Sequence, residues 1–542
     1  MMNLMKIRTH SYPFAAFTLL LVLVAGCPQA ISQAAAVSQP GLAPTPPMGW
    51  ASWNHYFCDY TDQSIRDQAD ALVSSGMRDL GYRYVLIQEC IAPGRNADGS
   101  LIVDAKRFPH GMKDLVDYVH SRGLKAGTYT DIGVNTCAGK PYEGSYGHEE
   151  QDAATFAAWG MDFIEMDFCN HPAGITGRAI YERMAAAIQK TGRPMLFYLC
   201  AWGSESPWRW AQGKAQLWRT TGDISSDKNH VDWARMVGNF ESNVRHSVFS
   251  APESWNDPDM LEVGNPGLTP VEAQSHFSMW AISAAPLWAG NDLTEMSDST
   301  RSIYTNSEAI AVDQDPLGAG ASKVKEDSSG IEVWMKPLGT VGSGVDAVLL
   351  LNLSAAPAEA AVQWSSLGLK DKAQVRDLWT HKDLGTFLSG YKTQLPAHGS
   401  VLLKVSGEFS WTNGATYEAE WPGNTRGGDA VLVPCPDECS REYAVSLRGT
   451  GNGSGGSSLA FSQIGVPQSG RYSMNLAYIY SGLGVKTVQM RVNGAQPVDI
   501  PLRGDDYGSA KIPVDLNKGD NSIAFRFQGE GSVDIDRITV SQ

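Results

Sequence analysis

The sequence predicts an eight-stranded, closed (β/α)8 barrel followed by two antiparallel β-sandwich domains. Short apolar runs alternate with amphipathic helical segments over about 270 residues, which is typical of a β/α barrel. From about Ser322 the pattern changes to short strands separated by Gly, Pro and Ser, which indicates a sandwich, and a second β-rich segment starts after Glu408. A chain of 542 residues also exceeds what one core usually supports.

The first segment predicts an export signal. Lys6 and Arg8 precede an apolar run, 14–25, that is too short to cross a bilayer as a helix. The run ends in VAGC at 24–27, which resembles the lipobox of bacterial lipoproteins, so we expect a lipid anchor at Cys27 and no transmembrane span; an ordinary cleaved signal is the alternative. The expected location is periplasmic, cell-surface or secreted, where disulfides are allowed.

The barrel is expected at 44–318, after a linker rich in Pro, Ala and Gln at 28–43. Its helix at 111–123 carries an apolar stripe with i, i+3, i+4, i+7 spacing and a terminal glycine. An open doubly wound sheet is less favoured, because no Gly-rich phosphate turn follows a strand. The expected strands include 82–90, 123–133, 160–169, 194–203, 217–224, 246–252 and 280–290.

The two later domains are predicted from strand patterns alone. The first sandwich, 319–407, has expected strands at 330–338, 346–354, 374–385 and 399–407. The second, 408–542, opens with ATYEAEWPG and closes with GSVDIDRITVSQ.

The charge balance favours neutral partners. The chain has 43 basic and 58 acidic residues, for a formal charge of -15. That charge repels phosphate backbones and anionic lipids, so no nucleic-acid partner is expected. Neutral partners, among them an oligosaccharide or polysaccharide, fit best.

The cysteines are expected to form structural disulfides. Seven remain after Cys27, and their positions relative to the strands favour three pairs and one free thiol, although the sequence does not fix the connectivity. None has the spacing of a zinc site. The expected pairs are Cys58 with Cys90, Cys137 with Cys169 and Cys435 with Cys439, which leaves Cys200.

Two carboxylates are placed for chemistry. Asp167 closes the strand at 160–169, and Asp223 follows the strand that begins at Leu217. In a β/α barrel the C-terminal strand ends face the active site. A pair of carboxylates is what glycoside hydrolysis needs, and a retaining outcome requires them about 5–5.5 Å apart. The alternatives are a helix cap for Asp167 and a turn for Asp223; Asp131, Asp257 and Asp259 compete for the same roles.

The order of motifs resembles glycoside hydrolase family 27, the α-galactosidase (melibiase) family. The matching segments run from Pro46 to about Pro316 and include GWASWNHYFC, TYTDIG with NTCAG, MDFCN, LCAWG, WRTTGDI and WNDPDMLEVGN. The resemblance implies a (β/α)8 barrel, a C-terminal β domain, a retaining mechanism and no catalytic cofactor. It implies an exo-acting hydrolase that removes terminal α-D-galactosyl-like residues.

By resemblance, Asp167 matches the nucleophile and Asp223 the acid/base, and Asp259 supports the pocket. The cysteines at 58, 90, 137 and 169 match the two barrel disulfides of the family. The positions that match sugar contacts are Trp50, Tyr129, Cys200, Trp202 and Arg219.

Sugar-reading residues depart from the family pattern at three places in the sequence. Gln88 and Glu89 replace two adjacent aspartates, Glu165 replaces a lysine, and Ala201 replaces Glu or Gln. A glutamate at 165 only accepts hydrogen bonds when ionised, whereas a lysine donates them. The carboxylates at 89, 165 and 167 should also raise the pKa of at least one member.

These departures leave the sugar open. The longer Glu89 would suit β-L-arabinopyranose, which lacks the C6 hydroxymethyl group, and relatives with that specificity carry an Asp-to-Glu change in this pair. Ala201 would suit the acetamido group of an α-N-acetylgalactosaminide. A sugar-binding protein without turnover is a further alternative, disfavoured because both carboxylates are kept.

The last domain resembles carbohydrate-binding modules of families 6 and 35. The resemblance is carried by YEAE and VDIDRITV, and it implies a structural calcium ion at Glu418, Glu420 and Asp536; exposed acids on edge strands are the alternative. Four aromatic residues are expected either to stack on a sugar or to pack in the core: Tyr417, Trp421, Tyr478 and Tyr480.

Overall fold

The structure is a computed structural model, and it describes residues 41–140, 143–225, 231–435, 439–450, 456–480, 484–504 and 506–542. The predicted export signal, the expected anchor at Cys27 and most of the linker lie outside these residues. No helix in the described ranges is long and apolar enough to span a membrane.

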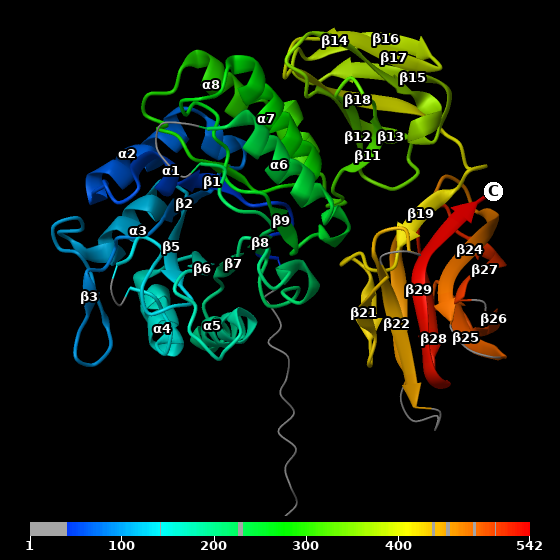
Figure 1. Cartoon of the computed structure of the whole chain (residues 1–542), viewed down its shortest axis with the longest axis horizontal. Helices are drawn as coiled ribbons and strands as arrows, with labels where there is room; N and C mark the ends of the chain where they lie inside the picture. The colour runs from blue at the N-terminus through cyan, green and yellow to red at the C-terminus, as the bar shows by residue number, and fades with distance from the viewer. Residues whose placement is uncertain are drawn as a thin grey trace, which may run out of the picture. The chain divides into compact units, whose positions relative to one another are not determined.

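Eight parallel strands form the barrel in the order β10-β1-β2-β5-β6-β7-β8-β9 (Figure 1). The ring is closed by a parallel bridge between Leu261 and Ala289, where the N–H of Leu261 donates to the Trp288 carbonyl at 2.7 Å. The predicted barrel is therefore confirmed over the open sheet. The strands are β1 (Met48–Ala51), β2 (Tyr84–Ile87), β5 (Lys125–Asp131), β6 (Phe163–Asp167), β7 (Leu196–Cys200), β8 (Leu217–Arg219), β9 (Trp255–Asp257) and β10 (Leu287–Ala289).

Helices follow the strands and surround the barrel (Figure 1). The predicted stripe on α3 (Gly111–Ser121) is buried at Met112, Leu115, Val116 and Val119, as an amphipathic helix requires. The connection from β7 to β8 has only the 3-10 helix η2 (Pro207–Arg209). The other helices are α1 (Trp53–Tyr56), α2 (Asp62–Ser74), α4 (Glu149–Trp159), α5 (Gly177–Thr191), α6 (Trp233–Val244), α7 (Pro270–Ser283), α8 (Asp298–Tyr304) and α9 (Ser307–Asp313).

One predicted strand in this region was wrong, and the strand predicted at 280–290 is confirmed only near its end, as β10 (Leu287–Ala289). Residues 246–252 contain the 3-10 helix η3 (Ser247–Phe249), and the barrel strand is β9, a few residues later. Residues 280–283 end helix α7, which a capping box of Thr269 and Glu272 starts. Helix α7 is buried on nearly all sides, and a uniformly apolar segment has no period that separates a helix from a strand.

The first sandwich pairs a six-stranded sheet with a two-stranded sheet, both antiparallel. Its core holds buried aliphatic side chains such as Val333, Leu350 and Leu403. The predicted antiparallel sandwich is confirmed, although β14 and β17 were not expected. The strands are β11 (Ser322–Glu326), β12 (Ile331–Pro337), β13 (Val345–Asn352), β14 (Ala358–Gln363), β15 (Leu369–Asp377), β16 (Lys382–Leu388), β17 (Gly390–Leu395) and β18 (Ser400–Phe409).

The second sandwich consists of two antiparallel sheets, β21-β22-β29-β24-β27 with β19 beside β29, and β20-β23-β28-β25-β26. Between them lies a separate apolar core that includes Leu447, Phe461 and Ile535. The strands are β19 (Ala415–Glu418), β20 (Thr425–Gly427), β21 (Val431–Pro434), β22 (Tyr443–Thr450), β23 (Ser457–Val466), β24 (Gly470–Tyr480), β25 (Val485–Val492), β26 (Val498–Arg503), β27 (Asp506–Leu516), β28 (Gly519–Phe527) and β29 (Glu530–Ser541).

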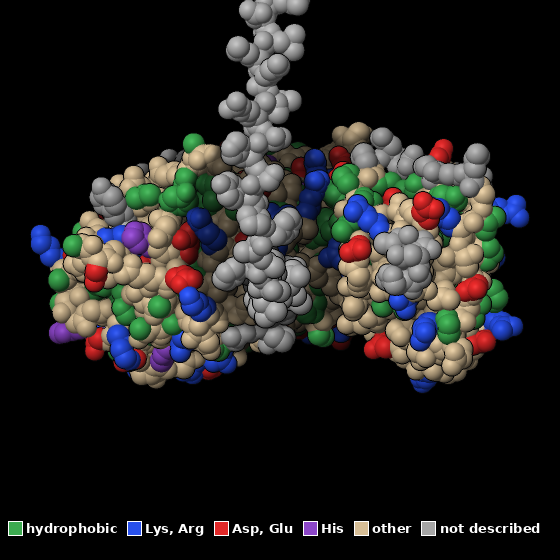
Figure 2. All heavy atoms as spheres, turned by 90° about the horizontal axis from the view of Figure 1, so that it is seen from below, with side chains coloured by type: hydrophobic (Ala, Val, Ile, Leu, Met, Phe, Trp, Pro, Cys, Tyr) green, Lys and Arg blue, Asp and Glu red, His purple; other side chains and the backbone are tan. Residues whose placement is uncertain are grey.

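All three predicted disulfides are present, and Cys200 is a buried free thiol. On the face in Figure 2 basic and acidic side chains are interspersed over the described surface. Two of the cross-links, Cys58–Cys90 and Cys137–Cys169, join segments that follow barrel strands, whereas Cys435–Cys439 lies between β21 and β22 of the second sandwich.

Candidate active site

The predicted site residues gather at one end of the barrel, where the parallel strands finish. The barrel strands β1, β2, β5, β6, β7, β8 and β9 each contribute a side chain near or just beyond their carboxyl ends. Parallel strands bring these positions to one edge because all their carboxyl ends point the same way. In strand order they are Trp50, Gln88, Glu89, Tyr129, Glu165, Asp167, Cys200, Trp202, Arg219, Asp223 and Asp259.

Asp167 ends β6 with its carboxylate held by two donors. The N–H of Phe168 donates to Oδ1 at 2.8 Å, and the Tyr129 hydroxyl lies 2.9 Å from Oδ2. Only 8% of Asp167 is exposed. Burial raises the pKa of Asp167 to about 7, and the charges of Asp223 and Glu89 add to that rise. A fixed carboxylate in a low-dielectric setting suits a nucleophile.

Asp223 lies in the turn beyond β8 with its side chain 49% exposed. The Arg219 guanidinium holds it at 2.8 Å and also holds the buried Asp259 at 2.9 Å. Because the charge of Asp223 raises the pKa of Asp167, the two carboxylates share one electrostatic environment. A half-exposed carboxylate that exchanges protons with solvent fits an acid/base better than a buried one.

Glu89 is bound entirely by the protein. Its Oε1 accepts from the Tyr129 hydroxyl at 2.9 Å, its Oε2 accepts from the Thr136 hydroxyl at 3.1 Å, and the Ala138 N–H lies 3.0 Å from both oxygens. The residue is 2% exposed. Its extra methylene therefore carries the carboxylate into the loop after β5, and this anchoring role was not expected from the sequence.

Gln88 and Glu165 form a buried pair. The side-chain amide nitrogen of Gln88 donates to Glu165 Oε2 at 2.7 Å, and the side-chain oxygen of Gln88 accepts from the N–H of Trp53 at 3.0 Å. Burial raises the pKa of Glu165 well above its usual value, and the charge of Asp167 adds to the rise. The expectation that clustering raises a pKa agrees in direction, but burial is the larger cause.

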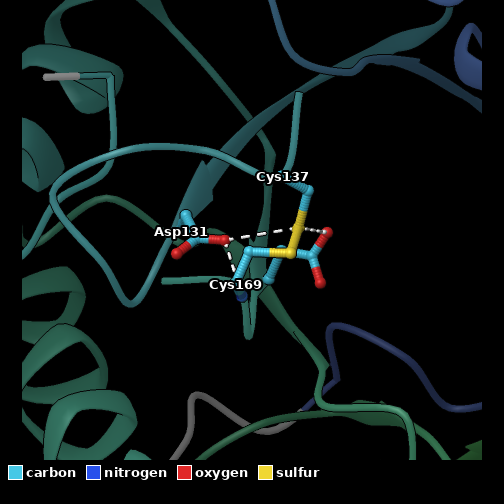
Figure 3. A group of neighbouring side chains, drawn as sticks. Asp131, Cys137 and Cys169 are labelled. Atoms are coloured by element: carbon cyan, nitrogen blue, oxygen red, sulfur yellow. Dashed lines mark hydrogen bonds between the residues drawn. A yellow bond between two sulfur atoms is a disulfide. The ribbon is translucent and has the colours of Figure 1, made fainter. Parts of the chain in front are cut away.

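A further acid, Asp131, lies beside the Cys137–Cys169 disulfide (Figure 3), and Cys137 is in contact with the Asp167 carboxylate. Asp131 is fully buried and accepts from the N–H groups of Gly133 at 2.6 Å and Cys169 at 3.0 Å. Burial, followed by the charge of Asp167, raises the pKa of Asp131 to about 9. Cys137 Sγ lies 3.0 Å from Asp167 Oδ2, and its bond to Cys169 excludes it as a metal-binding thiolate.

The other residues expected to contact the sugar lie at the same end of the barrel, and their side chains differ in exposure. The Trp50 indole is buried and donates to the Asn291 carbonyl at 2.8 Å, whereas Trp202 is half-buried with a left-handed backbone. Cys200 is 3% exposed. Ala201 is completely buried in the main core, so it leaves no open space beside the site.

Two of the three predicted calcium residues of the second sandwich share a hydrogen-bond partner, but Glu418, Glu420 and Asp536 are not among the groups of described residues whose ligand atoms all lie within 4.8 Å of one another. Glu418 on β19 and Asp536 on β29 both accept from the Ser440 hydroxyl, at 2.6 and 3.1 Å. Glu420 is 1% exposed, and neither of its carboxylate oxygens has a hydrogen-bond partner among the described residues. Burial raises the pKa of Glu420 to about 9, with contributions from the charges of Glu418 and Asp536. Unpaired buried carboxylates of this kind fit a hard cation such as Ca²⁺.

The aromatic residues expected to stack on a sugar mostly pack inside. Tyr417, Tyr478 and Tyr480 are at most 8% exposed and belong to the core of the second sandwich. Only Trp421 is half-buried. Core packing is therefore the correct interpretation for the three tyrosines.

Comparisons with known proteins agree with this geometry. The profile of the family described as alpha galactosidase A matches residues 45–315, and that of the alpha galactosidase C-terminal beta sandwich domain matches 328–405. An α-galactosidase from Cyamopsis tetragonoloba is 43% identical over 365 residues, 67% of this chain and 86% of the relative. Alpha-galactosidase A from Cellvibrio japonicus is 42% identical over 391 residues, 69% of this chain and 95% of the relative.

Solved structures show the same similarity. The crystal structure of α-galactosidase I from Mortierella vinacea superposes with a TM-score of 0.64 at 35% identity, over 69% of this chain and 100% of that one. An α-galactosidase from Saccharomyces cerevisiae gives a TM-score of 0.63 at 28% identity, over 69% and 100%.

Proposed function

This chain belongs to the alpha galactosidase A family of glycoside hydrolases, and on that premise we propose that it is an exo-acting, retaining enzyme that removes terminal α-D-galactosyl-like residues. The observation that carries the proposal is the placement of Asp167 and Asp223 on β6 and just beyond β8, at the same barrel mouth. Only β7 separates the two strands, and the charge of one carboxylate raises the pKa of the other.

In the proposed mechanism Asp167 attacks the anomeric carbon while Asp223 protonates the leaving oxygen. The Phe168 N–H and the Tyr129 hydroxyl hold the Asp167 carboxylate in position, so little ordering is needed when it reacts. Asp223 then takes a proton from a water molecule, which attacks the anomeric carbon from the face that the leaving group vacated, and the bond between the sugar and Asp167 breaks. Arg219 fixes Asp223 through Nη2, and its second ion pair, to Asp259, fixes Arg219.

The terminal sugar is the finer part of the proposal. Gln88 stands where the family has an anionic aspartate, and Glu165 stands where it has a cationic lysine. The sugar hydroxyl beside Glu165 therefore meets a hydrogen-bond acceptor when Glu165 is ionised. Galactose is the first candidate. β-L-Arabinopyranose is the second, because the Glu89 carboxylate is occupied by Tyr129, Thr136 and Ala138 and leaves no free acceptor for a C6 hydroxyl.

A panel of p-nitrophenyl glycosides tests the activity and the sugar together. The panel contains the α-D-galactoside, the β-L-arabinopyranoside and the α-N-acetylgalactosaminide. We expect release from one of the first two, retention of anomeric configuration in the first product seen by NMR, and a loss of about 10⁴-fold or more in kcat for Asp167→Ala. Glu165→Lys should shift the ranking toward galactose. An inverted product, or no release from any glycoside, would refute the proposed reaction.

For the second sandwich we propose a carbohydrate-binding module of the 6/35 type. Glu418, Glu420 and Asp536 would hold its Ca²⁺, and the ion would neutralise the buried Glu420 carboxylate.

The three disulfides are typical of an oxidising compartment. We propose that the chain is exported and acylated at Cys27, so that the enzyme acts on polysaccharide near a membrane surface. Labelling with a palmitate analogue, lost in Cys27→Ser, tests the anchor.

A further inference from the structure

Asp131 is a buried acid to which the proposed mechanism gives no part. It ends β5 and is paired in the parallel ladder with Asp167, which ends β6. Asp131 is 0% exposed, so it is closed off from a sugar that binds at the barrel mouth. One of its oxygens nevertheless lies within 4.8 Å of an oxygen of the Asp167 carboxylate, in the group of side chains that Figure 3 shows.

The turn that follows the nucleophile donates to both carboxyl groups. The N–H of Phe168 donates to Asp167 Oδ1 at 2.8 Å, and the next N–H in the chain, that of Cys169, donates to Asp131 Oδ2 at 3.0 Å. The two N–H groups belong to adjacent rigid peptide units, so a movement of one changes the direction of the other. The bond to Asp131 therefore helps to fix the donor that orients the nucleophile.

The loop after β5 holds the same turn by close packing. Gly133 donates its N–H to Asp131 Oδ1 at 2.6 Å, and a Cβ at Gly133 would lie 2.7 Å from the carbonyl oxygen of Asn170 and 2.8 Å from that of Cys169. Asn170 has a left-handed backbone, with φ at 49°, and its side chain donates to the Thr136 carbonyl at 2.9 Å. A residue other than glycine in this conformation depends on the contacts around it.

A carboxyl group is the side chain that these contacts require at position 131. Asp131 accepts at both oxygens, from Gly133 at one and from Cys169 at the other. An asparagine has only one acceptor oxygen, so its NH2 group would face one of the two N–H groups, donor against donor. A buried N–H without an acceptor is unfavourable, so the turn would shift away from position 131.

We propose that Asp131 is a positioning residue for the nucleophile. Through the N–H of Cys169 it holds the turn that directs the Asp167 carboxylate at the anomeric carbon. The inference rests on the proposed function, because it needs Asp167 to attack a sugar. The position of the carboxylate matters for the rate, because a displacement of about 1 Å can cost about 100-fold in a reaction between aligned groups.

The test supplies a nucleophile that does not depend on this turn. In Asp167→Ala, added azide can attack the anomeric carbon of the p-nitrophenyl glycoside from the face that Asp167 occupied. Its terminal nitrogen forms the new bond, the bond to p-nitrophenolate breaks, and a glycosyl azide is the product. The effect of Asp131→Asn is measured twice, on kcat of the wild type and on the azide-dependent rate of Asp167→Ala.

Glu143→Gln is the matched control. Glu143 is also a buried acid that accepts from two N–H groups, those of Ile91 and Ala92, but it accepts both at Oε1, so a glutamine keeps them. Gly133→Ala is a second test variant, because its methyl group would press on the turn at Cys169 while Asp131 stays in place. If Asp131→Asn does not fold, Gly133→Ala decides by the same two measurements.

We expect Asp131→Asn and Gly133→Ala to lower kcat about tenfold or more, with KM within about twofold of the wild type. Glu143→Gln should keep the wild-type kcat. The azide-dependent rate of Asp167→Ala should be the same with and without Asp131→Asn, because azide does not need the turn. An azide-dependent rate that falls as far as kcat, or an unchanged kcat in Asp131→Asn, would overturn the positioning role alone. If the wild type cleaves no glycoside, the proposed function fails, and this inference fails with it.

Discussion

Replacing Glu89 by glutamine should make the nucleophile ionise at lower pH. The Tyr129 hydroxyl has one proton, yet it lies 2.9 Å from Glu89 Oε1 and 2.9 Å from Asp167 Oδ2. When both carboxylates are ionised they compete for that proton. A glutamine with its amide nitrogen in the place of Glu89 Oε1 would donate to the Tyr129 oxygen, and its carbonyl in the place of Oε2 would still accept from Thr136 and Ala138. The Tyr129 proton would then point to Asp167.

The size of the effect follows from two causes with the same sign. Glu89→Gln gives Asp167 an uncontested hydrogen bond, and bonds to charged groups contribute about 1.5–3 kcal/mol. It also removes a negative charge that raises the pKa of Asp167. We expect the pKa that governs the acid limb to fall by about one to two units from about 7, which corresponds to about 1.4–2.7 kcal/mol.

The assay is kcat/KM for a p-nitrophenyl glycoside between about pH 4 and 9 at constant ionic strength. Glu143→Gln is the matched control, because Glu143 is a buried carboxylate whose pKa burial raises to about 7, and it binds the N–H groups of Ile91 and Ala92 rather than Tyr129. An acid limb in Glu89→Gln that stays in place or moves to higher pH would refute the reasoning.

Three further outcomes are expected. Arg219→Lys should lower kcat/KM and the melting temperature, because one ammonium cannot bridge both Asp223 and Asp259 and a buried pair costs about 3–5 kcal/mol to break. Asp346→Asn should raise the free energy of unfolding above pH 7, as urea unfolding would show. Burial raises the pKa of Asp346 in the folded protein to about 7. The stability of the wild type should therefore fall by about 1.4 kcal/mol per pH unit between about pH 4 and pH 7, where Asp346 is ionised in the unfolded chain but protonated in the fold. EDTA should lower the melting temperature of the second sandwich in the wild type but not in Glu420→Gln, as calorimetry would show.

The sequence was sufficient for the barrel because its strands end in polar residues at regular places. Asp167 follows a run of buried residues on β6, and Arg219 ends β8, so strand ends alone indicated the mouth. The strand expected at 246–252 was wrong because Val248 and Phe249 pack in a 3-10 helix, where an apolar residue is as favourable as in a strand.

The contacts inside the site were not predictable in the same way. Glu89 binds Thr136 and Ala138, which are 47 and 49 residues away, and no local pattern encodes such a pairing. The position of Glu89 suggested contact with the sugar, but its longer side chain places the carboxylate against the loop after β5. In the second sandwich, Tyr478 and Tyr480 are two residues apart on β24, so they share a face of the strand, and both are buried in the core. The alternating pattern of a strand does not show which of its two faces is buried.

The Cys137–Cys169 bridge joins the loop after β5 to the residue two positions beyond the nucleophile. A chain synthesised where thiols stay reduced would keep its barrel, whose parallel ladder does not involve this bond, yet would hold that loop without a covalent link, through hydrogen bonds such as those to Glu89 and Asn170. Enzyme recovered from a reducing cytoplasm should then be folded but poorly active, and gentle oxidation should restore turnover without any change in secondary structure.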